Sequence, residues 1–220
     1  KLHFRYWLSF IILIVLLLVF IFWNINSGSI SISLKDIFQI LFHKNGDETA
    51  YNIVWEIRLP RILAAVILGG ALSVSGFLLQ TFFGNPIAGP FVLGISSGAK
   101  LIVALTMIYL LGKSMVATSG LMILAAFTGS LISMGFVLLI SRKVKQMSML
   151  VVSGIMIGYI CSAITDFVVT FADDSNIVNL HNWSMGSFSG MSWEHIRIMV
   201  IIVGITVVIT FGLAKPISAY

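Results

Sequence analysis

The chain has 220 residues, of which 59% are apolar and 10% charged, and its mean hydropathy is +1.07. These values lie far outside the range of soluble globular domains, so the composition indicates a membrane protein. The net charge of +5 at pH 7 reflects membrane topology and not nucleic-acid binding, because no basic patch alternates with exposed aromatic residues.

Six apolar segments are long enough to cross a bilayer, which takes roughly 20 residues per helix. They run approximately over residues 5–25, 60–83, 91–111, 118–140, 148–171 and 196–214. Glycine and proline inside them are compatible with membrane helices, and the alternation typical of barrel strands is absent. The sequence therefore predicts an all-α, polytopic membrane helix bundle with about six transmembrane helices.

Basic residues near the ends of the spans predict the orientation of the chain. The short loop 141–147 carries Arg142, Lys143 and Lys145, and the acidic loop residues fall on the opposite side of the membrane. We therefore expect a cytoplasmic N-terminus, with the loop 141–147 inside and the segment 26–57 outside.

The segment 26–57 contains an amphipathic pattern. Apolar residues at positions 34, 37, 38, 41 and 42 recur at helical spacing and predict a short helix at the membrane interface. In the other long outer segment, 172–195, Trp183 and Trp193 fit an interfacial belt of aromatic residues.

Arg58 and Arg61 flank Pro60 at the outer edge of the second span. On the first turn of a helix they would share one face and point outward, and proline suits that turn. Two cations at a helix N-terminus oppose its dipole, which an external acidic partner would explain. Docking of such a partner and anchoring at the interface are both open interpretations.

The segment Gly84–Pro90 separates the second and third spans and carries no charge. Asn85-Pro86 cannot continue a regular helix, because proline lacks the backbone donor and restricts the residue before it. We expect a tight, shaped turn on the cytoplasmic side.

Small residues recur at four-residue spacing in several spans, a pattern that lets membrane helices approach closely. Ordinary helix packing explains any single stripe, and together the stripes favour a compact bundle. The residues that we expect at helix contacts are Gly69, Ser73, Gly76, Gly94, Gly98, Gly154 and Gly158.

Lys100 and Asp166 are the charged residues that lie clearly inside predicted spans. Lys100 is about mid-span and Asp166 nearer the outer end of its helix. Charge within a membrane is costly and marks a pathway or a pair, so we expect a buried pair or a water-facing placement. The offset strains a direct bond, although a lysine stem can extend.

Enzyme chemistry finds little support. Gly94–Gly98 matches a nucleophile-elbow pattern but lacks the α/β sheet which that motif needs. The four histidines are not clustered with other ligands, and no phosphate-binding Walker loop is present. We expect no catalytic residues, no metal and no cofactor. A secondary transporter or channel bundle is the alternative, although the inverted repeats typical of such transporters are not found.

Several of these residues together resemble one known family. The matching block comprises Arg58–Arg61, Gly70–Leu72, Ser75-Gly76, Gln80, Asn85–Pro90 and Leu93–Ala99. It resembles the FecCD-type permeases, the membrane subunits of type II ABC importers for ferric siderophores, haem and cobalamin. Trp183–Ser187 and Trp193 are similar to the outer loop of the iron-chelate branch of this family.

The resemblance implies a ten-helix permease of the bacterial cytoplasmic membrane that carries an iron chelate. Such permeases form homo- or heterodimers, associate with two cytoplasmic ATPase subunits and receive substrate from an extracytoplasmic binding protein. Residues 1–220 would be a single permease domain, truncated after the sixth span, without the coupling helices and the last four spans. The partners are therefore these proteins and the lipid bilayer, not nucleic acid.

The resemblance also assigns roles to residues. Arg58 and Arg61 would pair with carboxylates of the binding protein. Lys100 and Asp166 depart from the small or apolar residues usual in the family. The cytoplasmic gate would comprise Asn85, Pro86 and Ile87, with isoleucine replacing the usual leucine, and Met147 and Ser148 from a second loop.

Overall fold

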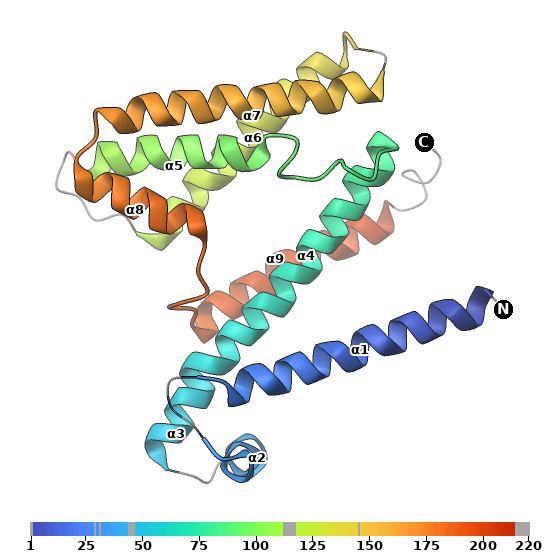
Figure 1. The fold of residues 1–220 in the computed structure, drawn as a ribbon, viewed down its shortest axis with the longest axis vertical. Coiled ribbons are helices and arrows are strands. Elements are labelled where there is room, and N and C mark those ends of the chain that lie inside the picture. The colour runs from blue at the N-terminus through green and yellow to red at the C-terminus, as the bar shows by residue number, and fades with distance from the viewer. Residues whose placement is uncertain are drawn as a thin grey trace. The chain divides into compact units, whose positions relative to one another are not determined.

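The computed structural model describes residues 2–28, 30, 32–43, 47–111, 118–144 and 146–213. Within these ranges the regular structure is helical (Figure 1), which confirms the all-α prediction. The helices are α1 (Leu2–Asn26), α2 (Leu34–His43), α3 (Glu48–Asn52), the π-helix η1 (Ile53–Arg58), α4 (Leu59–Phe83), α5 (Ile95–Leu111), α6 (Ser119–Ser141), α7 (Met147–Thr170), α8 (Asp174–Met185) and α9 (Trp193–Gly212).

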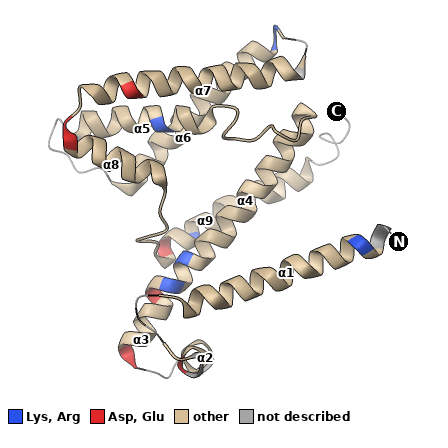
Figure 2. Cartoon of the chain, viewed as in Figure 1, with Lys and Arg blue, Asp and Glu red and all other residues tan. Residues whose placement is uncertain are grey.

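Helices occur at all six predicted spans, and Figure 2 shows long stretches of α1, α6 and α7 largely free of charge. The helix at the third predicted span, α5, has 17 residues and is shorter than the span 91–111, because residues 91–94 form a turn. Among the described residues, five segments are long and apolar enough to cross a membrane: Phe4–Asn26, Glu48–Phe83, Ser119–Ser141, Ser148–Thr170 and Trp193–Gly212.

The second span begins earlier than the sequence suggests. Helix runs without a break from Glu48 to Phe83, and the Asp47 carboxylate caps its start by accepting a hydrogen bond from the Ala50 amide at 3.4 Å. The expected helix start beside Pro60 is therefore wrong. Because the field of a helix end falls off within one turn, the dipole argument does not apply to Arg58 or Arg61.

The π-helix η1 explains how Pro60 lies inside a continuous helix. The Leu59 amide donates to the Val54 carbonyl, five residues back, so the next donor in that register would be residue 60. Proline has no donor, which leaves the Trp55 carbonyl without a main-chain partner in this register. The Trp193 indole N–H fills that position at 2.9 Å, and its ring lies 5.8 Å from that of Trp55.

The chain divides into two compact units, which are described separately. The first comprises Lys1–Ala71 and Phe188–Gly212, and the second Leu72–Ser187 and Leu213–Tyr220, so α4 belongs to both. In the first unit α2 buries Ile37 and Ile40 and exposes Phe38, which confirms the short amphipathic helix. The core of this unit contains Ile25, Ile32, Ile37, Ile40, Val54 and Ile62.

In the second unit α5 packs against α6, α7 and α8 (Figure 1). Small residues bring α5 close to α6. A Cβ added at Gly98 would lie 2.7 Å from the Gly129 carbonyl oxygen, so the two backbones are in contact there. The Ser133 hydroxyl, on α6, donates to the Gly94 carbonyl at 2.9 Å and connects α6 to the residue that precedes α5.

Candidate functional site

Arg58 is buried, with 8% of its surface exposed. Its guanidinium donates to the Ile25 carbonyl at 2.6 Å and to the Ile30 carbonyl. The first of these belongs to the last turn of α1, where carbonyls have no partner within the helix. A Cβ at Gly28 would lie 2.5 Å from Nη2 of Arg58, so the backbone after α1 closes directly over the guanidinium. Arg58 therefore joins the end of α1 to the second span.

Arg61 has different surroundings. Its side chain is exposed, and its Nη2 donates to the Ser189 hydroxyl at 3.5 Å, the upper end of the range for a hydrogen bond. Both arginines line a cavity of about 280 Å³. The prediction that both point outward is thus wrong for Arg58, whose guanidinium binds backbone carbonyls, whereas Arg61 is the exposed cation of this pair.

The break after α4 is a tight turn. The Asn85 side-chain oxygen accepts a hydrogen bond from the Ile87 amide at 2.9 Å, and Gly84 adopts a positive φ of 55°. Pro86 and Ile87 are exposed, with 70% of the isoleucine surface free, whereas Ala88 is fully buried. One side of the turn is therefore fixed in the fold and its apolar tip is presented outward.

The turn shares a core with the beginning of α7, where the second gate segment was predicted. Ser148 is exposed, and the side chain of Met147 lies outside the described part of the structure. The shared cluster contains Phe83, Ala88, Leu93, Val137, Leu150 and Val151. The structure thus brings the two segments of the proposed gate into one packed region.

The predicted packing glycines fall into two groups. Gly94 adopts a φ of 72°, and a Cβ there would lie 2.7 Å from the Gly154 carbonyl oxygen and from the Gly158 amide nitrogen. Together with Gly98 against α6, these positions are close helix contacts. A Cβ at Gly69 or Gly76 would meet no atom within 4 Å in the described ranges, and Ser73, on the same helix, is exposed.

The expectation for Lys100 and Asp166 was a buried pair or a water-facing placement. Lys100 is half-buried in the second turn of α5, whereas Asp166 is exposed on α7. No ion pair joins them in the part of the chain that the structure describes. Lys100 instead lines a cavity of about 520 Å³, whose other walls are Phe91, Ile95, Ser96, Ser97, Ala99, Ser130, Ser162, Trp183 and Ser184.

The serines of this cavity come from four helices, so spacing along the chain does not relate them to Lys100. Serines 96, 97, 130 and 162 do lie in apolar segments, and polar residues within membrane helices mark functional positions. The polar character of these positions is therefore visible in the sequence, although their proximity to Lys100 is not.

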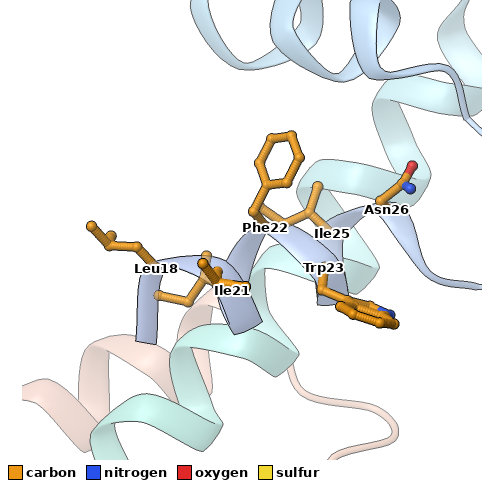
Figure 3. A pocket seen from close by; sticks show the side chains of 7 residues that line it. Leu18, Ile21, Phe22, Trp23, Ile25 and Asn26 are labelled. Atoms are coloured by element: carbon orange, nitrogen blue, oxygen red, sulfur yellow. The ribbon is translucent and has the colours of Figure 1, made fainter. Parts of the chain in front are cut away.

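A hollow of about 740 Å³ is lined by residues of α1 (Figure 3). Its walls are apolar apart from Asn26, and Figure 3 shows Phe22 and Trp23 extending in different directions from the helix. Apolar side chains on a membrane helix suit contact with lipid or with another helix.

Long apolar helices in contact through glycine backbones define a polytopic helical membrane protein. A model of the FecCD transport family matches residues 16–220, and the chain belongs to that family. The vitamin B12 import system permease protein BtuC of Klebsiella pneumoniae is 39% identical over 148 residues, which cover 67% of this chain and 44% of that protein. The Escherichia coli BtuC is 37% identical over 150 residues, 68% of this chain and 45% of that protein.

The chain thus matches less than half of the length of these relatives. Its fold is similar to that of a solved structure described as an inward-facing conformation of a metal-chelate type ABC transporter. The TM-score is 0.75 at 23% identity, with 93% of this chain and 61% of the other covered. This likeness extends the resemblance of the matching block to the arrangement of the helices.

Proposed function

We propose that the chain is part of the transmembrane permease subunit of an ABC importer and forms the pathway for an iron chelate. The family match over residues 16–220 carries this proposal. Separate ATPase subunits would hydrolyse ATP, a second permease subunit would complete the pathway, and an extracytoplasmic binding protein would deliver the substrate. We place the protein in the bacterial cytoplasmic membrane with its N-terminus inside. Residues Trp183–Ser187, similar to the iron-chelate branch, support an iron substrate.

Reconstituted uptake tests this function. The complete importer in proteoliposomes should accumulate a ferric chelate only when ATP is supplied to the ATPase side and the binding protein to the other side. A secondary transporter would instead respond to an ion gradient, and a channel would equilibrate substrate without ATP. Uptake that ignores ATP but follows a proton or sodium gradient would refute the importer assignment.

A corrinoid is the second candidate substrate, because BtuC relatives from several bacteria are named for vitamin B12 import. The same vesicles distinguish the candidates when they are given a ferric chelate or cobalamin with the corresponding binding protein. Saturable, ATP-driven uptake of cobalamin and none of any ferric chelate would replace the iron assignment with the corrinoid one.

We propose Asn85, Pro86 and Ile87 as part of the cytoplasmic gate, together with Met147 and Ser148. The exposed Ile87 side chain at the tip of a tight turn supports this role, because an apolar tip opposite its copy in a dimer can exclude water. Ile87→Ala should raise the leak of substrate without ATP, whereas Ile87→Leu should not. Unchanged leak and unchanged ATP-driven uptake in the alanine variant would remove Ile87 from the gate.

We assign docking of the binding protein mainly to Arg61. Its exposure supports this, whereas Arg58 already binds two carbonyls. Charge pairs at the rim of an interface steer and orient partners. Arg61→Glu should weaken docking, and a binding protein with its facing carboxylate changed to lysine should restore it. Equal affinity of wild type and Arg61→Glu at low salt would exclude this role.

A further inference from the structure

The cavity around Lys100 contains one cation and several hydroxyl groups in a segment that is otherwise apolar. Its volume of about 520 Å³ lies in the range of small-ligand sites. The walls come from α5, α6, α7 and α8 and from the turn before α5, all within the second unit. The packing of that unit therefore forms the cavity.

Lys100 has no compensating charge there. None of the residues that line the cavity is acidic, and among the described residues no hydrogen bond or ion pair involves its ammonium group. Asp166, the acid in α7, is exposed and does not line the cavity. An unpaired charge at membrane depth is expensive and marks a functional position. An anion in the cavity would balance this charge.

The start of α5 adds to the positive potential. Ser96 and Ser97 lie in its first turn, where backbone N–H groups have no partner within the helix and the dipole is positive. The Ser162 hydroxyl donates to that of Ser97 at 3.4 Å, which leaves the Ser97 proton available to a ligand. Ser130, by contrast, donates to the Ala126 carbonyl at 2.8 Å. The donors thus concentrate on α5, beside Lys100.

We propose that this cavity binds an anionic oxygen group, a carboxylate or phosphate, of the transported molecule, with Lys100 and the Ser96 and Ser97 hydroxyls as its donors. The indole of Trp183 forms an apolar wall against which the organic part of the molecule packs. The proposal rests on the proposed transport function and makes it more specific: the substrate is an anionic chelate.

Equilibrium binding tests the site without ATP. The complete importer is placed in nanodiscs of phosphatidylcholine and dialysed against radiolabelled ferric citrate, an anionic chelate, or against a neutral ferric trihydroxamate. Loss of a charged hydrogen-bond partner costs about tenfold or more in affinity. Lys100→Gln should therefore bind ferric citrate about tenfold more weakly, and Lys100→Arg should stay close to wild type.

Two controls make the result specific. Lys143→Gln removes an exposed lysine outside the cavity and should leave ferric citrate binding unchanged. The neutral chelate should be insensitive to Lys100→Gln. Equal affinity of wild type and Lys100→Gln for ferric citrate, or an equal loss in Lys143→Gln, would overturn the proposal.

A lipid headgroup carries the same anionic chemistry. Binding is therefore repeated in nanodiscs that contain phosphatidylglycerol. If this lipid displaces ferric citrate from wild type but not from Lys100→Gln, a headgroup occupies the cavity and the substrate assignment falls; unchanged affinity supports the proposal. ATP-driven uptake is measured separately. A functioning importer in which Lys100→Gln binds normally refutes only the site, and binding at Lys100 without ATP-driven uptake refutes only the transport function.

Discussion

Replacing Arg58 by methionine tests whether this residue closes the end of α1 or meets a partner protein. Methionine keeps the length and the apolar stem but removes every donor. The Ile25 carbonyl belongs to a buried residue, whereas Ile30 is 51% exposed and its carbonyl can turn to water. A hydrogen bond to a charged group contributes about 1.5–3 kcal/mol. Most of the lost hydrogen-bond energy comes from the Ile25 carbonyl. We therefore expect Arg58→Met to destabilise the protein by about 2–3 kcal/mol.

A loss of this size should be visible as a lower melting temperature. For a domain of this length it corresponds to about 5–10 °C. The assay heats the purified permease in detergent and follows the folded fraction by size-exclusion chromatography. Arg61→Met is the matched control, because it removes the same group from an exposed position three residues away. The control should melt within about 0.5 kcal/mol of wild type but bind the binding protein more weakly, with a salt dependence that screening predicts.

The opposite pattern would refute this division of roles. If Arg58→Met melts with wild type and loses docking as much as Arg61→Met, the Arg58 guanidinium reaches the partner in the assembly and does not hold α1. Arg58→Lys distinguishes charge from geometry, since lysine keeps the charge but lacks the planar fork that reaches two acceptors. We expect it to recover only part of the lost stability.

Three further predictions concern packing, the π-helix and topology. Gly129→Ala should destabilise by about 2 kcal/mol or more, because its Cβ would overlap the Gly98 carbonyl, whereas Gly135→Ala on the same helix meets no atom within 4 Å and should melt like wild type. Trp193→Phe should cost about 1 kcal/mol or more by leaving the partly buried Trp55 carbonyl without its donor; an unchanged melting temperature would exclude that bond. In a variant without the native cysteine, an impermeant thiol reagent applied to intact cells should label cysteine at position 47 and not at position 143, and the reverse pattern would invert the topology.

The helices could be predicted from the sequence because each depends on local composition. A run of about 20 apolar residues has few alternatives to a membrane helix, and six such runs gave six helices in the described ranges. The short helix α2 followed from its amphipathic period in the same way. The packing glycines that were identified from four-residue spacing include four at close contacts: Gly94 lies against α7, Gly98 against α6, and Gly154 and Gly158 against the turn before α5.

The start of the second span could not be predicted from the same rules. Proline is typical of the first turn of a helix, which suggested a start at residue 60. Three contributions not visible in the local pattern move it to Glu48: the Asp47 cap, the π-helical register of η1 and the indole of Trp193. The last of these is 138 residues from the carbonyl that it satisfies. A long-range hydrogen bond of this kind has no signal in sequence spacing.

The candidate sites also combine features that the local sequence shows with features that depend on contacts between distant residues. Arg58 and Arg61 look equivalent in sequence. Arg58 becomes a structural residue only because the backbone at Gly28 closes over its guanidinium. Lys100 was recognised as exceptional because a charge inside an apolar run is visible in the sequence. Its surroundings were not, since the hydroxyls of the cavity come from different helices and are collected by the close approach of α5 to its neighbours.

That close approach also constrains how the proposed gate can move. At its α5 end the turn is fixed, since Leu93 is fully buried against Gly154 and the Gly94 carbonyl accepts the Ser133 hydroxyl. At its α4 end Gly84 has a positive φ, and a Cβ there would meet nothing within 4 Å. Displacing the first end would break contacts with two helices, whereas Gly84 itself has open space around it. We therefore expect the turn to open from Gly84, with Ile87 carried on the moving part and Lys100 held in place on α5.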